Sequence, residues 1–390
     1  MARKLRYLQA PETTFLVTMR AFQSRFLLRP SKELNDIVLG VIGRALALYP
    51  ITLHIVVVAS NHFHFLLTTS SSKLLSDFMR YVNANIAREI GKLHRWRGTF
   101  WEDRYHAQPI LDREEMVRRV DYLLAHGCKE GLVLSPADWP GINCLEALVD
   151  GVELEGTWYD RTKEYEARRA GRKVAFGHFA TRYPVKLLPV PFLAEESERS
   201  QRTWYRKLVA SIEQRTRELL TKEGHRVLGR HNVLAMDPHH MPEQSKRSPQ
   251  PACLCSRLED WKEYCDAYRE FAARYRVASR QLRNGVHDAV FPANCFPPPA
   301  AYTGRTEPAE IQPSVSQRTE PTAAPVRSPV QPDRLSRQPH QQSAGQQPTS
   351  SASGEMQSNP SRIGKPYRLR DSHPDSHPDS HPKKTRKPDP

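Results

Sequence analysis

Two apolar segments separated by a short polar turn constrain the fold of this chain more than any other feature. Residues 51–59 (ITLHIVVVA) are rich in β-branched side chains and predict a buried strand. After a turn at Ser60 and Asn61, residues 62–68 (HFHFLLT) predict its antiparallel neighbour. This second segment is apolar apart from its histidines, which is typical of a central strand. The hairpin therefore predicts the middle of a β-sheet.

Strand and helix patterns alternate on both sides of this hairpin. Residues 13–22 (TTFLVTMRAF) predict a first strand, and Ser31 can cap a helix that runs to Tyr49. Residues 74–93 predict a long amphipathic helix, and residues 105–111 predict a fourth strand. Four strands and two helices therefore precede the last helix of this region.

That last helix begins after Asp112, which can cap it, and Glu115 completes a capping box three residues on. It carries Tyr122 and is expected to end near Gly127. The order β-α-β-β-α-β-α predicts an α+β fold of ferredoxin-like type, an antiparallel sheet with helices on one face and a C-terminal tyrosine helix. The other face of the sheet is then free to carry a site.

Composition changes twice along the chain and divides it into three regions. Residues 1–150 carry the strand and helix pattern. Residues 151–296 predict a mostly helical accessory region, with amphipathic helices at 197–222 and 259–282. Apolar residues nearly vanish from 297 to 390, so this basic Pro-, Ser- and Gln-rich tail is expected to be disordered. The hydrophobic fraction of the whole chain, only 38%, agrees with such a tail.

Positive charge predominates, with 58 Lys and Arg against 43 Asp and Glu and a formal net charge of +15. This excess favours a polyanionic partner such as nucleic acid or an anionic membrane surface. No segment has the length and hydrophobicity of a membrane span, so no membrane is expected as a partner. The six cysteines are scattered, which suits a reducing cytoplasm.

His62 and His64 are the first candidate site residues. They are two positions apart on a predicted strand, so both imidazoles project to one face while Phe63 points to the other. Two adjacent imidazoles form half of a site for a divalent metal ion. The pair could equally be structural, because a lone His-x-His pattern has little specificity.

Tyr122 and His126 are four positions apart on the last predicted helix and therefore share one of its faces. If this helix lies across the open sheet face, His126 becomes a third metal ligand and Tyr122 lies beside the metal. A phenol with its usual pKa of about 10 is a poor nucleophile, and it needs a phosphate that a metal ion has polarised. The combination predicts attack of Tyr122 on a phosphodiester, although Tyr122 alone would be read as a packed helix residue.

Three segments carry a resemblance to a known family. SNHFHFLL (60–67) resembles the His-hydrophobic-His segment of the HUH nucleases. YLLAHGCKEGLV (122–133) with DWPGIN (138–143), and GTFWEDRYHAQPI (98–110) between these motifs, resemble the REP-associated tyrosine transposases, which belong to the insertion sequence 200/605-like transposases. The resemblance covers roughly residues 5–145.

The resemblance implies a metal-dependent transposase that cuts and rejoins single-stranded or hairpin DNA through a 5′-phosphotyrosine intermediate. It places a divalent ion, Mg²⁺ or Mn²⁺, at His62 and His64 and the nucleophile at Tyr122. His126 departs from the family, which often has Gln or Asn at this position, and His126-Gly127 stands where Asn-Pro is frequent. The family implies action in the bacterial cytoplasm, at the nucleoid, by a homodimer or a monomer.

A second tyrosine and several basic residues are further candidates. Tyr105, in the matching Arg-Tyr of the strand motif, is the rival nucleophile, although the family's tyrosine there looks structural or DNA-contacting. The basic and aromatic side chains near the motifs could contact phosphates and stack on bases; the DNA-binding candidates are Arg95, Arg97, Trp101, Arg104 and Lys129. The alternative is a solvated basic surface with tryptophans in the core.

Other functions remain open at this stage. A replication-type nickase would use the same chemistry, but the compact spacing and the missing helicase region oppose it. A DNA-binding regulator that no longer cleaves has no need of His62, His64 and Tyr122 together. A zinc site at Cys253 and Cys255, with Cys265 and the pair His239-His240, does not have the spacing of a usual structural zinc site.

Overall fold

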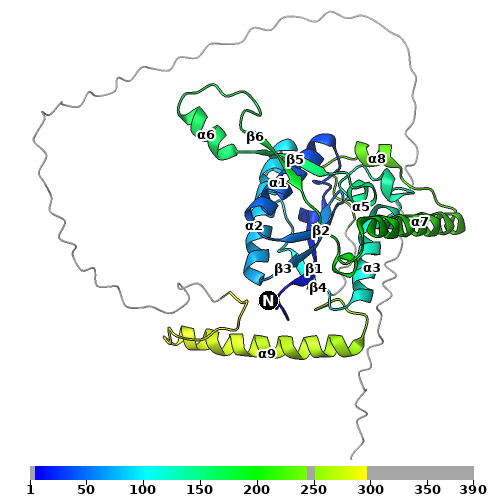
Figure 1. Cartoon of the computed structure of the whole chain (residues 1–390). Helices are drawn as coiled ribbons and strands as arrows, with labels where there is room; N and C mark the ends of the chain where they lie inside the picture. Colours follow the sequence, from blue (N-terminus) through cyan, green and yellow to red (C-terminus); the bar gives the residue numbers. More distant parts are fainter. Residues whose placement is uncertain (1–4, 244–250, 297–390) are drawn as a thin grey trace, which may run out of the picture. The chain divides into compact units, whose positions relative to one another are not determined.

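A four-stranded antiparallel sheet forms the centre of the computed structural model, which describes residues 5–243 and 251–296 (Figure 1). Its strands lie in the order β2-β3-β1-β4; they are β1 (Thr13–Arg20), β2 (Thr52–Val58), β3 (His62–Thr69) and β4 (His106–Pro109). With its two crossover helices, this order is that of a ferredoxin-like fold, so the predicted fold class is confirmed. The predicted tail, 297–390, lies outside the described residues.

The helices α1 (Lys32–Leu48) and α2 (Ser72–Leu93) cover one face of the sheet. The helix α1 begins after Ser31 as predicted, whereas α2 begins two residues before its predicted start. The side chains of Ser31 and Ser71 accept hydrogen bonds from the third backbone N–H that follows each of them. Between helices and sheet lies a hydrophobic core that includes Phe63, Phe65 and Phe78. This face of the sheet stabilises the fold by burying apolar surface.

The helix α3 (Arg113–Leu124) belongs to the core on the opposite face, where its apolar side chains pack with Leu16, Ile55 and Leu66 of the sheet. Asp112 caps it as predicted, accepting from the backbone N–H of Glu115 at 2.8 Å. The predicted end near Gly127 is wrong by three residues. The helix stops at Leu124, and a separate single turn, α4 (His126–Lys129), follows Ala125.

Tight packing around Gly127 accompanies this break. A Cβ atom at Gly127 would lie 3.0 Å from Val133 and 3.2 Å from the Trp139 ring. The indole of Trp139 donates to the backbone oxygen of Val58 at 3.0 Å, so the segment after α4 is fastened to the end of β2. The turn that carries His126 is therefore held against the sheet by the chain that follows it.

The accessory region contains the two long helices expected, α7 (Glu198–Glu223) and α9 (Leu258–Arg283). It also contains a second antiparallel pair of strands, β5 (Leu154–Tyr159) and β6 (Ala180–Val185), which the sequence patterns did not predict. Shorter elements complete the described chain: α5 (Leu145–Asp150), α6 (Arg161–Arg169), α8 (Arg230–Ala235) and the 3-10 turns Phe22–Ser24, Pro136–Asp138 and Pro191–Leu193. None of the helices in the described part combines the length and hydrophobicity that a membrane span requires.

The segment before α9 contacts the start of the tyrosine helix. Leu254 forms a bridge with Ile110 at the end of β4, and its backbone N–H donates to Pro109 at 2.8 Å. The backbone N–H of Ser256 donates to the second carboxylate oxygen of Asp112 at 2.6 Å. Residues 254–256 thus help to fix the N-terminus of α3.

Candidate active site

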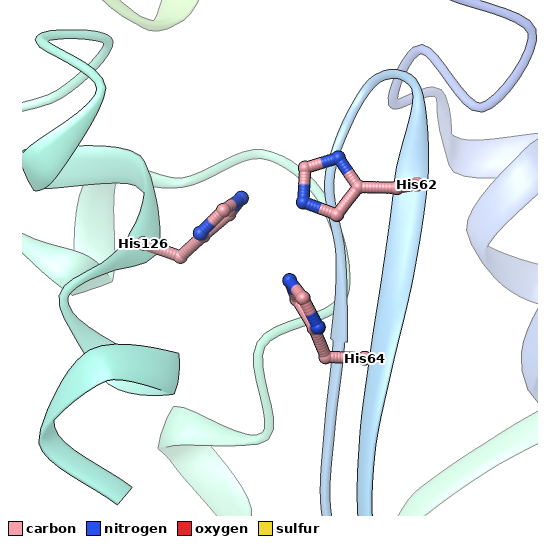
Figure 2. Close-up of side chains that lie close together, drawn as sticks. All are labelled: His62, His64 and His126. Atoms are coloured by element: carbon pink, nitrogen blue, oxygen red, sulfur yellow. The ribbon is translucent and has the colours of Figure 1, made fainter. Parts of the chain in front are cut away.

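The register of β3 puts two histidines on the sheet face that α3 and α4 adjoin. His62 and His64 alternate with Phe63 and Phe65, which point into the opposite core. Figure 2 shows the two imidazoles rising from one strand toward that of His126, which comes from α4. The structure therefore brings together the three residues that the sequence analysis proposed as ligands.

The three imidazoles form a compact cluster. Ring centroids are 4.8 Å apart for His62 and His64, 4.8 Å for His62 and His126, and 5.3 Å for His64 and His126. One ring nitrogen of each lies within 4.8 Å of the others, close enough to bind one ion after small side-chain adjustments. Among the residues that the structure describes, no other three histidine, cysteine or acidic side chains gather in this way, and Cys253, Cys255 and Cys265 are not such a group.

Hydrogen bonds orient two of the rings. Nδ1 of His64 lies 2.8 Å from the hydroxyl of Thr18 on β1, and Nδ1 of His62 lies 2.6 Å from the amide oxygen of Asn61. Each of these bonds leaves Nε2 as the ligand atom, an arrangement usual for metal-binding imidazoles. Sequence reasoning missed both partners, although Thr18 could have been found from the pairing of β1 with β3.

Two nitrogens in the cluster are buried without any hydrogen-bond partner, Nε2 of His64 and Nδ1 of His126. A buried polar atom without a partner costs roughly 1–3 kcal/mol. A metal ion would supply the missing partner for both atoms. The donor set and these two atoms fit a divalent ion, and three nitrogen ligands suit a transition ion such as Mn²⁺ better than Mg²⁺.

Burial keeps the cluster neutral, which is the state that a metal ligand needs. It lowers the pKa of His126 to about 4, with a further contribution from the charge of Lys129. Burial also lowers the pKa of His62 and His64 well below the ordinary value, and the neighbouring His126 and Arg20 add to the effect. Protons therefore compete little for the three nitrogens at neutral pH.

Tyr122 lies beside this cluster. Its ring centroid is 5.8 Å from that of His64 and 5.9 Å from that of His126. The ammonium of Lys129 lies 4.9 Å from the centre of the Tyr122 ring. A phenol, a cation and a candidate metal centre thus share one side of the sheet, although Tyr122 and His126 belong to separate helical segments.

Tyr105, the rival nucleophile, occupies a different environment. Its ring packs against the core on the α1/α2 side of the sheet. The guanidinium of Arg6 lies 3.5 Å from the ring centre, and the Tyr105 hydroxyl lies 3.4 Å from that of Ser76. Burial raises the pKa of Tyr105 above its ordinary value. A phenol held in this way is suited to packing rather than to attack.

The five residues proposed to contact DNA lie in different parts of the structure. Arg95 and Arg97 are exposed in the loop after α2, and Lys129 lies at the cluster. Trp101 stacks edge-on against Phe63, and its indole donates to the backbone of Asn83 at 2.9 Å, so this ring serves the core. Arg104 is exposed beside Tyr105.

Arg20 is a further residue at the cluster that sequence reasoning missed. It pairs with His62 in the β1–β3 register and is two positions from Thr18, so it shares the face of the histidines. Its side chain is exposed, and its nearest hydrogen bond is a long one of 3.4 Å to the hydroxyl of Ser24. A permanent positive charge therefore borders the cluster on its open side.

One protein family matches part of the chain. Residues 27–122 match the family described as "Transposase IS200 like", and Tyr122 is the last residue matched. The resemblance to IS200-like transposases that the sequence motifs indicated is thereby confirmed for this part of the chain. A search of curated proteins finds no match.

Two solved structures are similar to part of the chain. One is a REP-associated tyrosine transposase bound to a REP hairpin, with 19% identity, coverage of 38% of this chain and 86% of that chain, and a TM-score of 0.33. The other is a candidate transposase from Deinococcus radiodurans R1, with 14% identity, coverage of 32% and 97%, and a TM-score of 0.24.

Proposed function

We propose that this protein is a transposase that cleaves and rejoins single-stranded, hairpin-flanked DNA in the bacterial cytoplasm, with residues 1–150 as its catalytic domain. The family match supports the transposase role. The observation that carries the mechanism is the position of Tyr122 beside three imidazoles on one sheet face, of which those of His64 and His126 are buried.

His62, His64 and His126 would hold a divalent ion, with Mn²⁺ favoured over Mg²⁺ by the three nitrogen donors. When bound, such an ion polarises the scissile phosphate and offsets the negative charge that develops on its oxygens. Thr18 and Asn61 keep two of the rings in the orientation that this task requires.

Tyr122 is the nucleophile of the proposed reaction. Its phenolic oxygen attacks phosphorus, the bond from phosphorus to the 3′-oxygen breaks, and the 3′-oxygen leaves as a hydroxyl after taking up a proton in place of the one that the phenol releases. The 5′ end of the DNA remains bonded to the tyrosine. A 3′-hydroxyl from another strand can then reverse the step, so rejoining needs no external energy source.

Positive side chains would hold the DNA at this centre. Arg20 and Lys129 lie on two sides of the cluster and can contact the non-bridging oxygens of the scissile phosphate. Arg95 and Arg97 are exposed on the loop that follows α2. Further along this loop, Trp101 forms a β-bridge with Ala21, so the loop adjoins the end of β1 next to Arg20. These four cations support a path for a single strand past the end of β1.

The test is adduct formation on a hairpin oligonucleotide with single-stranded flanks, in Mn²⁺ or Mg²⁺. We expect the wild-type chain to yield a protein–DNA adduct that survives denaturing electrophoresis, and Tyr122→Phe to yield none. Tyr105→Phe is the matched control, because it removes one hydroxyl from the other side of the sheet and should still form the adduct. Adduct formation by Tyr122→Phe, or loss of the adduct only in Tyr105→Phe, would contradict the assignment.

A further inference from the structure

The strands β5 and β6 form a ribbon that packs directly on α1. At Gly40 of α1, a Cβ atom would lie 2.1 Å from the backbone of Thr157, and at Gly43 it would lie 2.8 Å from the backbone oxygen of Pro184. Only glycine permits so close an approach of helix and ribbon. The two strands, here called the root of the ribbon, are therefore fixed to α1.

Polar and aromatic contacts strengthen this root. The guanidinium of Arg161, at the start of α6, lies 2.6 Å from Glu89 of α2, whose side chain is only 5% exposed. Arg161 also binds Glu164 at 2.8 Å. The Trp158 ring lies 5.8 Å from that of Tyr81. The charge of Arg161 is therefore neutralised within the protein, and the start of α6 is held against α2.

The chain between the two strands carries an excess of positive charge. Residues 160–179 contain six Lys and Arg and three acidic residues, Asp160, Glu164 and Glu166. Two of these acids are already paired within the segment, Glu164 with Arg161 and Arg168, and Asp160 with Lys163. Three exposed cations, Arg169, Arg172 and Lys173, form no ion pair within the described structure. Their charges are left for a partner outside the chain.

Exposed aromatic rings accompany these charges. The exposed fraction is 65% for Tyr165 and 75% for Phe176, both unusually high for large apolar side chains. Phe176 lies near the root, with its ring 5.5 Å from that of Tyr159. Cations that contact phosphates together with aromatic rings that stack on bases are the means by which proteins bind single strands.

We propose that residues 154–186, here called the basic arm, are a second DNA-binding site that takes a single-stranded segment. Arg169, Arg172 and Lys173 contact its phosphodiester backbone, and Phe176 and Tyr165 stack on its bases. The arm rests on α1, whereas the histidine cluster lies on the sheet face that α1 does not cover. The strand bound by the arm is therefore a different segment from the one cleaved, and its binding does not depend on Tyr122.

The experiment measures the affinity of the full chain for a fluorescent single strand by anisotropy at several salt concentrations, in a Tyr122→Phe background that excludes cleavage. The test variant is Arg169→Gln/Arg172→Gln/Lys173→Gln. We expect its slope of log affinity against log salt to fall by about 2, because each phosphate contact on a single strand contributes about 0.7. The control variant, Arg276→Gln/Arg280→Gln/Arg283→Gln on α9, loses the same charge and should keep the wild-type slope.

A second variant tests the stacking. Phe176→Ala should lower affinity for the single strand by about 5-fold or more without changing the slope, since stacking on one base contributes roughly 1–3 kcal/mol. An unchanged slope in the basic-arm variant, or an equal fall in the control, would overturn the site. Equal losses for single strand and duplex, with no effect of Phe176→Ala, would overturn the assignment to single strands. Failure of adduct formation leaves these outcomes unaffected, because they measure binding alone.

Discussion

The two faces of strand β3 differ in what they contribute to the molecule. Phe63, Phe65 and Leu67 point to one face, where α1 and α2 bury them almost completely. His62 and His64 point to the other, where two buried nitrogens of the histidine cluster have no hydrogen-bond partner. Alternation along a single strand thus separates the part that stabilises the fold from the part that is suited to chemistry, and the second part costs stability.

The same division separates the two tyrosines. Tyr105 packs on the apolar side with Arg6 over its ring, and Tyr122 lies on the histidine side with Lys129 over its ring. Both are aromatic residues near a cation, so the cation contact does not distinguish them. Proximity to the three imidazoles does.

The largest expected effect on stability comes from the apolar face. Phe65 has no exposed surface, and its ring packs on those of Phe63 and Phe78. Phe65→Ala should lower the free energy of unfolding by about 3–5 kcal/mol, because it opens a cavity in a close-packed core. Urea unfolding followed by circular dichroism measures this change.

The comparison variant is His64→Ala. It should lower the free energy of unfolding by much less, because it removes the hydrogen bond to Thr18 but also a buried nitrogen without a partner. If His64→Ala destabilised the protein as much as Phe65→Ala, the cluster would be part of the structural core and the contrast between the two faces would fail.

The next effect concerns metal binding. His126→Ala should weaken Mn²⁺ binding by more than about 100-fold, since outer hydrogen-bond partners of metal ligands alone contribute 10- to 100-fold. Electron paramagnetic resonance of free Mn²⁺ during a titration reports this affinity without any DNA. His126→Gln should retain part of it, because an amide oxygen can still act as a ligand. Equal Mn²⁺ affinity in wild type and His126→Ala would exclude His126 from the site.

A smaller effect is the pH dependence of the metal-free protein. Burial lowers the pKa of His126 to about 4, whereas an unfolded histidine has a pKa of about 6.5. The unfolded chain therefore takes up a proton first, and the free energy of unfolding falls as the pH drops through 6.5 toward 4. At pH 5, His126 alone should account for a loss of about 2 kcal/mol relative to pH 7.

Urea unfolding in a chelator at pH 7 and pH 5 tests this effect. His126→Gln should lose about 2 kcal/mol less than wild type between the two pH values. The same loss in both proteins would show that His126 is as accessible to protons in the folded protein as in the unfolded chain.

Local patterns were sufficient to predict much of the fold and the candidate ligands. The capping residues Ser31 and Asp112 begin helices as expected, and strand alternation places His62 and His64 on one face. These features depend on neighbours in the sequence, which the sequence displays directly. The position of His126 is a partial success, because the residue reaches the cluster from a separate turn rather than from the tyrosine helix.

Features that depend on distant partners could not be predicted in this way. β5 is short, and β6 contains Pro184, so neither has a strong strand pattern, and both depend on contact with the glycines of α1. Arg20 and Thr18 join the site only through the register of β1 with β3. The sequence alone allowed Trp101 to be a base-stacking residue. Its contact with Phe63, which the sequence does not display, shows that it packs in the core.

The central claim is that Tyr122 is the residue that becomes bonded to DNA. The most direct measurement is mass spectrometry of the protein–DNA adduct after nuclease trimming and proteolysis. The account predicts a nucleotide linked through its 5′-phosphate to the peptide that contains Tyr122, with the Tyr105 peptide unmodified. A nucleotide on Tyr105, or on any residue remote from His62, His64 and His126, would contradict it.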